Sequence, residues 1–126
     1  MLYTVLCYHD EAAVDALTKE EDDALMANLA VVRQKLSAEG KLGPVARLMP
    51  TTAATTLREG RESLVIDGPF AETKEQLLGF YVLDCATLEE AIEATRRLMA
   101  PRVAAGLKCA LEIRPISVFH PGSGST

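Results

Sequence analysis

The stretch LGFYVLDCATLEEA, residues 78–91, contains a strand that passes directly into a helix. Its first half is apolar and rich in aromatic and β-branched residues, as in a buried strand. Thr87 and Glu90 then have the spacing of a capping box, in which a hydroxyl and a carboxylate accept bonds from the free N–H groups of a helix start. Apolar residues follow at helical spacing, and we expect Pro101 to end the helix.

The beginning of the chain repeats this strand and helix pair. Residues 2–8 form a short apolar run, and a second capping box begins at Thr18. The apolar residues after it have helical spacing and predict a helix over residues 19–39, with Gly40 as the usual residue just past a helix end. Residues 11–17 have room for one additional helical turn.

The rest of the chain supplies further strands. We expect strands at residues 45–49 and 107–119, and a β-hairpin whose turn is at the Glu59-Gly60 pair. The order is strand, helix, strand, hairpin, strand, helix, strand, which predicts the α+β class and a ferredoxin-like split βαβ with an inserted hairpin. Residues 1–119 form one domain in this interpretation, and the Gly/Ser-rich residues 120–126 form a disordered tail.

The two strands that precede the helices are apolar on both faces. In residues 2–8 and 78–85, apolar side chains occur at both the odd-numbered and the even-numbered positions. A strand of an antiparallel sheet with one face in water should instead alternate apolar and polar side chains. Two helices cover only one face of a sheet. We therefore expect a homodimer in which the second faces of two sheets pack together and enclose an intersheet cavity.

Composition excludes several classes of protein. The 126 residues carry a formal net charge of −5 without a cluster of basic residues, so we expect no nucleic-acid partner. The opening residues do not resemble a signal peptide, and no apolar stretch has transmembrane length. Cys7, Cys85 and Cys109 stand within apolar runs without metal-ligand spacing. They predict free core thiols of a cytoplasmic protein and no metal site. The chain also lacks the glycine-rich motifs that bind nucleotides, so we expect no cofactor.

The segment VIDGPFAETKEQLLGFY, residues 65–81, resembles the YCII-related proteins and, among them, the subfamily named for its Asp-Gly-Pro-Phe motif. The likeness continues through Tyr3, Tyr8, Asp10 and Glu11 at the start and residues 112–115 at the end. The resemblance implies a ferredoxin-like fold paired into a dimeric α/β barrel. It also implies a bacterial protein of unknown function. Many members accompany extracytoplasmic-function sigma factors, which suggests a role in regulation or in the handling of small molecules.

In one branch of that family a His on the first helix and an Asp were proposed as an acid/base pair. The helix expected at residues 19–39 contains no His, so that pair does not transfer to this chain. From the residues alone, Asp67 is either a turn carboxylate of the Asp-Gly-Pro motif or a desolvated general base. His9, at a strand end, is either a solvated loop residue or the proton shuttle that assists Asp67.

Three further residues are candidates for contact with a ligand. Arg114 lies on the polar side of the last strand, where it can bind a carboxylate or phosphate or form an ion pair with Glu112. Arg47 and Tyr81 are weaker candidates. Two functions follow: a cofactor-free enzyme that performs acid/base chemistry on a small molecule in the intersheet cavity, or a regulatory module that binds a small molecule without turnover and is linked to sigma-factor control.

Overall fold

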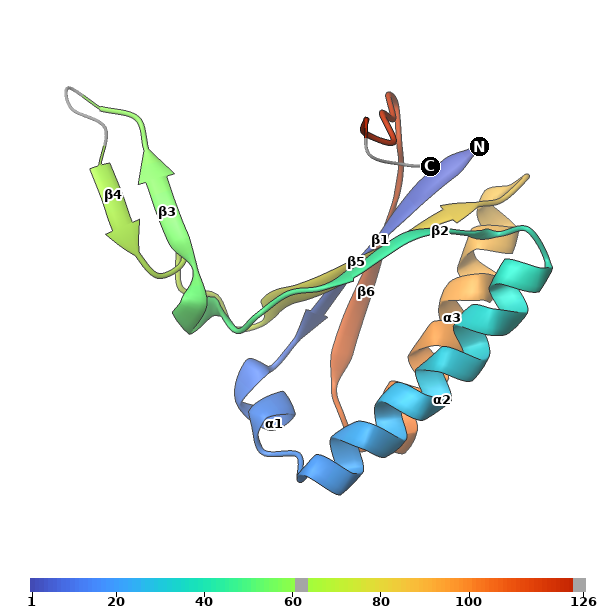
Figure 1. The fold of residues 1–126 in the computed structure, drawn as a ribbon, viewed down its shortest axis with the longest axis horizontal. Coiled ribbons are helices and arrows are strands. Elements are labelled where there is room, and N and C mark those ends of the chain that lie inside the picture. The colour runs from blue at the N-terminus through green and yellow to red at the C-terminus, as the bar shows by residue number, and fades with distance from the viewer. Residues whose placement is uncertain (61–63, 124–126) are drawn as a thin grey trace.

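A computed structural model describes residues 1–60 and 64–123 of the chain. Its centre is a four-stranded antiparallel sheet with two helices on one side (Figure 1). Across the sheet the strands are β2 (Leu42–Arg47), β5 (Gln76–Asp84), β1 (Leu2–His9) and β6 (Cys109–Pro115). The mixed class and the strand and helix order expected from the sequence are confirmed. No helix among the described residues is both long and apolar enough to cross a membrane.

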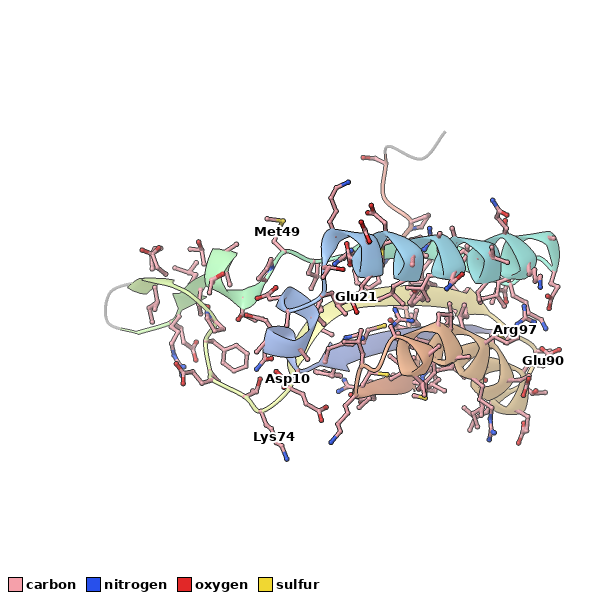
Figure 2. The ribbon with its side chains drawn as sticks, turned by 90° about the horizontal axis from the view of Figure 1, so that it is seen from below. Asp10, Glu21, Met49, Lys74, Glu90 and Arg97 are labelled. Carbon is pink, nitrogen blue, oxygen red and sulfur yellow. The ribbon has the colours of Figure 1, made fainter. Side chains whose placement is uncertain are left out.

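The helices begin and end where the sequence signals predict, with one exception. They are α1 (Glu11–Asp15), α2 (Lys19–Ala38) and α3 (Leu88–Ala104), and α2 and α3 lie side by side over the sheet (Figure 2). Thr18 and Glu21 form the capping box of α2. Gly40, with a φ of 74°, ends α2, and Lys41 N–H donates to the Leu36 carbonyl at 2.9 Å.

The expectation that Pro101 ends the second long helix was wrong. Pro101 lies inside α3, which continues for another turn to Ala104. Proline removes one N–H donor, but the helix ends in a tight cap: Gly106 has a φ of 80°, and Leu107 N–H donates to the Arg102 carbonyl at 3.0 Å. The added turn is important because it carries Arg102 beneath the sheet.

Two strand boundaries also differ from the expectation. The second strand begins earlier and ends at Arg47, and the last strand covers Cys109–Pro115 in place of residues 107–119. Pro115 has no N–H to continue a ladder, and Val118 and Phe119 beyond it are exposed. Residues 124–126 of the expected disordered tail lie outside the described residues.

The inserted hairpin is confirmed and extends from the end of the sheet (Figure 1). It consists of β3 (Thr55–Arg58) and β4 (Leu64–Asp67), preceded by a short 3-10 turn, Thr51–Ala53. Residues 61–63, next to the expected Glu59-Gly60 turn, lie outside the described residues. At the base of the hairpin, the Thr51 hydroxyl donates to Glu11 Oε1 at 2.8 Å, which ties the hairpin to α1.

The core lies between the sheet and the helices. Alternate residues of β1, from Tyr3 to His9, are buried against α2 and α3, while the intervening residues, from Leu2 to Tyr8, are half-buried on the open face. One core cluster joins β1 and β5 to Leu36 and Leu98 of the helices. A second, smaller cluster contains Leu25, Leu29 and Leu107.

Candidate functional site

A cavity of about 100 Å³ lies between the two core clusters, on the helix side of the sheet. We call it the His9 cavity. Strands β1, β2 and β5 line one side of it, and helices α2 and α3 line the opposite side. Its most exposed lining residues, Val45 and Arg47, belong to edge strand β2, so the cavity opens past this edge.

His9 reaches the cavity because of its position on β1. It continues the alternation of Tyr3, Val5 and Cys7, so its side chain points to the helix side and is only 6% exposed. Its Nδ1 atom is buried and has no hydrogen-bond partner among the described residues. Burial, together with the nearby positive charges of Arg102 and Arg47, lowers the pKa of His9 to about 4. The imidazole is therefore neutral near pH 7.

Arg102 lies across the cavity from the sheet, on the added last turn of α3. Its side chain is 7% exposed, and its guanidinium donates to the Leu98 carbonyl and, at 3.1 Å, to the Tyr81 hydroxyl. The guanidinium also lies 5.6 Å from the centre of the Tyr81 ring, within the range of a cation–π contact. No carboxylate lies within ion-pair distance of it, so this buried charge has no anionic partner in the part of the chain that the structure describes.

Two more arginines line the cavity. Arg47 Nη2 on β2 contacts Asp22 Oδ1 of α2 at 3.1 Å, which compensates its charge. Arg33 is half-buried on α2 and has no ion pair within the described ranges. The cavity lining thus contains three arginines, and no Asp or Glu from the described part of the chain. In an acidic protein this local excess of positive charge is unusual, and it attracts anions.

Cys7 also lines the cavity, but it is a poor nucleophile. Burial raises the pKa of the Cys7 thiol to about 11, an effect that the positive charge of Arg102 only partly opposes. The thiol is thus protonated at neutral pH, and the thiolate is the reactive form. The three cysteines are free thiols, as the sequence predicted. No group of three potential metal-binding side chains occurs in residues 1–60 and 64–123.

The structure brings three of the five candidate residues together and separates the other two. His9, Arg47 and Tyr81 all line the cavity. Asp67 lies at the end of β4 in the hairpin and is exposed. Asp67 is not desolvated within the chain, because among the described strands β4 pairs only with β3, and the Val65 side chain of β4 is 70% exposed.

Arg114 lies on the other face of the sheet from the cavity. In the register of β1 and β6 it is opposite Thr4, on the face that the helices do not cover. Its Nε contacts Glu112 Oε2 at 2.6 Å, which is the ion pair that the sequence offered as an alternative to ligand binding.

Lys74, in the loop before β5, projects away from the domain (Figure 2).

Sequence reasoning missed Arg102 and Arg33. A signal for Arg102 was present: it follows Ala91, Thr95 and Leu98 at helical spacing and so continues the buried stripe of α3. The expected helix end at Pro101 hid this pattern. Arg33 gives no comparable signal, because a charged residue on a long helix is usually solvated.

Comparison with known proteins identifies the family of this chain. Residues 1–117 match the YCII-related domain. The chain belongs to the YCII-related family. It is also 54% identical over 123 residues to an uncharacterised protein of Rhizobium meliloti (strain 1021), and the match covers 97% of each chain. This member of the YCII-related family therefore has a relative of nearly the same length, and the relative's name assigns it no activity.

Proposed function

We propose that this YCII-related protein is a cofactor-free enzyme that transfers protons on a small molecule bound in the His9 cavity. The observation that carries the proposal is the buried His9 side chain, whose Nδ1 has no hydrogen-bond partner within the described residues. An unsatisfied buried polar atom costs about 1–3 kcal/mol. A ligand that donates a hydrogen bond or a proton to His9 removes this cost.

The groups around His9 suit proton abstraction. A neutral imidazole can accept a proton from a carbon next to a carbonyl group, and the electron pair of the broken C–H bond then remains on the substrate as an enolate. The positive charges of Arg102 and Arg47 stabilise that negative charge. Return of the proton to a different atom completes an isomerisation, which needs neither an oxidant nor a reductant.

This proposal moves the reaction from the place that the sequence suggested. The expected intersheet cavity is on the open face, whereas the His9 cavity is on the helix side. We assign His9 as the base, with Tyr81 and Arg47 in contact with the substrate. Asp67 is then the turn carboxylate of the Asp-Gly-Pro motif, and Arg114 is a partner of Glu112 on the open face.

We also propose that the protein is a cytoplasmic, bacterial homodimer. The half-buried residues of β1 and the neighbouring Phe80 of β5 give the open face an apolar centre. The corresponding face of a second copy is a cover of matching shape and chemistry. The three free thiols agree with a reducing compartment.

The alternative is a regulatory module, linked to sigma-factor control, that binds a small molecule without turnover. The hairpin favours this function, because Leu57, Val65 and Phe70 on and beside it are 68%, 70% and 73% exposed. Exposed apolar side chains of this kind are typical of a surface that contacts another protein. In this case the His9 cavity would bind an effector, and His9 would transfer no proton.

Deuterium exchange distinguishes the two functions. Wild-type protein is incubated in D₂O with a panel of small carbonyl compounds, and loss of the C–H signal is followed by proton NMR. We expect His9→Gln to slow exchange by roughly 10²- to 10⁴-fold, the usual contribution of a general base. His120→Gln, which alters the exposed second histidine, and Asp67→Asn should exchange as wild type. Equal rates in His9→Gln and wild type, or no exchange in wild type, would reject catalysis.

A further inference from the structure

The charges of the His9 cavity identify the kind of molecule that it binds. We propose that the ligand is a short-chain carboxylate, whose carboxylate group pairs with Arg102 and whose apolar body lies against α2. This inference rests on the proposed function in one respect, since both place the ligand in the His9 cavity. It concerns binding, so it can hold even if His9 transfers no proton.

Arg102 is a buried positive charge that only neutral groups of the described residues contact. Taking a charged group out of water is costly unless an opposite charge or hydrogen bonds replace the lost solvation. The Leu98 carbonyl and the Tyr81 hydroxyl accept two bonds, and the remaining guanidinium N–H groups have no acceptor among the described residues. An anionic ligand would supply both the missing charge and the missing acceptors.

The geometry of Arg102 and Tyr81 suits a carboxylate group. A guanidinium is a planar fork that matches a carboxylate with two parallel N–H···O bonds. The Tyr81 hydroxyl accepts from Arg102, and its own O–H remains free to donate to the same carboxylate. A guanidinium also binds phosphate, but phosphate sites commonly add several backbone N–H groups at a helix start or in a glycine-rich loop. The lining of the His9 cavity comes instead from strand segments, from helical residues after the first turn of α2 and α3, from Val14 of the short α1, and from Leu107 after α3.

The rest of the cavity lining suits an apolar group of the ligand. Most of the remaining lining is aliphatic, including Val14, Leu25, Met26, Leu29 and Leu107. A dry cavity of about 150 Å³ accommodates benzene. The His9 cavity, at about 100 Å³, therefore encloses a smaller group and leaves longer substituents at the opening past β2. A branched or linear chain of about four or five non-hydrogen atoms fits this volume.

His9 and the carboxylate would also affect each other. Arg102 and Arg47 both disfavour a proton on His9, and Arg33 adds a third positive charge to the lining. A bound carboxylate offsets this positive charge, so it raises the pKa of His9 toward neutrality and makes the imidazole a better base. The substrate would thus activate the group that abstracts its proton.

Isothermal titration at pH 7 tests the proposal with defined probes. These are 3-methylbutanoate, its uncharged isostere 3-methylbutanamide, and ethyl phosphate. We expect the wild type to bind the carboxylate at least tenfold more tightly than either of the other probes. Equal binding of the amide, tighter binding of the phosphate, or no detectable carboxylate binding would overturn the proposal. These comparisons use only the wild-type protein, so they do not depend on the folding of any variant.

Variants then test the assignment to Arg102. Arg102→Met keeps the length and apolar stem of the side chain, and replacing an unpaired buried charge in this way is often tolerated. It should remove the preference for the carboxylate, while Arg96→Gln, on the exposed side of the same helix, should keep it. A folded Arg102→Met protein that retains the preference would contradict the assignment.

His9→Gln separates this proposal from the proposed function. The variant should bind 3-methylbutanoate within a few fold of wild type, since Arg102 remains in place. If wild type and His9→Gln both bind carboxylates but neither exchanges deuterium, the ligand class stands and the enzymatic function fails. If deuterium exchange depends on His9 but uncharged compounds bind as tightly as carboxylates, the function stands and the ligand class fails.

Discussion

His9 illustrates how a single position in a strand determines the chemistry of a residue. One residue further along the chain, Asp10 is exposed and caps α1 through a bond from Ala12 N–H to its Oδ1. His9 instead points toward the helices, because side chains alternate along a strand. Its neighbours in the adjacent strands are Gln76 and Cys109, and neither provides a carboxylate to stabilise a protonated imidazole.

This burial predicts a measurable pH dependence of stability. Between pH 6.5 and about 4 the unfolded chain binds a proton at His9 and the native protein does not. The free energy of unfolding therefore falls as pH falls through this window, by up to about 3 kcal/mol from this residue. The positive charges of Arg102 and Arg47 lower the pKa of His9 in the same direction as burial does.

Urea denaturation at a series of pH values measures this effect. Carboxylates also titrate near pH 4, so the wild type is compared with His9→Gln and with His120→Gln. We expect a shallower loss of stability between pH 6.5 and 4 for His9→Gln than for the other two proteins. The same slope in all three would mean that the pKa of His9 is not lowered in the native state.

At the scale of elements, the β2–β5 pair forms the mouth of the cavity and depends on a glycine. A β-carbon on Gly79 would lie 2.7 Å from the Ala46 carbonyl oxygen, closer than atoms can approach. Gly79→Ala should therefore push β2 from β5 and destabilise the protein by about 1–3 kcal/mol. Urea denaturation gives the stability, and hydrogen exchange should show faster exchange for the Leu48 N–H, which donates to the Leu78 carbonyl.

Gly106→Ala is a suitable control for this variant. A β-carbon there meets no atom within 4 Å, so its cost arises only from the positive φ of 80° and is about 1–2 kcal/mol. It should not change hydrogen exchange in β2. Wild-type stability of Gly79→Ala would show that β2 is not packed against β5 in this register.

At the scale of the whole molecule, the open face of the sheet governs the proposed dimer. Leu6 lies near the centre of this face, opposite Glu112 of β6. Leu6→Glu would place two carboxylates side by side in the interface and should dissociate the dimer. Light scattering after gel filtration should give twice the chain mass of 13.6 kDa for wild type and a single chain mass for the variant.

Leu88→Glu is the matched control, because Leu88 is 46% exposed at the start of α3, on the helix side. It should leave the mass unchanged. A monomeric wild type, or a dimeric Leu6→Glu protein, would exclude association through the open face.

Local signals in the sequence determined most of the fold. Capping boxes, a glycine after α2 and apolar periodicity predicted the elements and their order, because these features act over a few neighbouring residues. The predicted end of α3 was wrong because two local signals compete there. Pro101 indicates a helix end, yet the favourable cap at Gly106 allows α3 to continue for another turn.

Only the tertiary structure decided which residues meet in the site. His9, Tyr81 and Arg102 belong to three separate elements, and they approach one another because antiparallel pairing and helix packing fix which face each side chain occupies. The sequence placed Asp67 near a cavity, but its strand pairs only within the hairpin and stays exposed. Alternation along a strand can be read from sequence; the face that becomes buried depends on long-range packing, which local patterns do not encode.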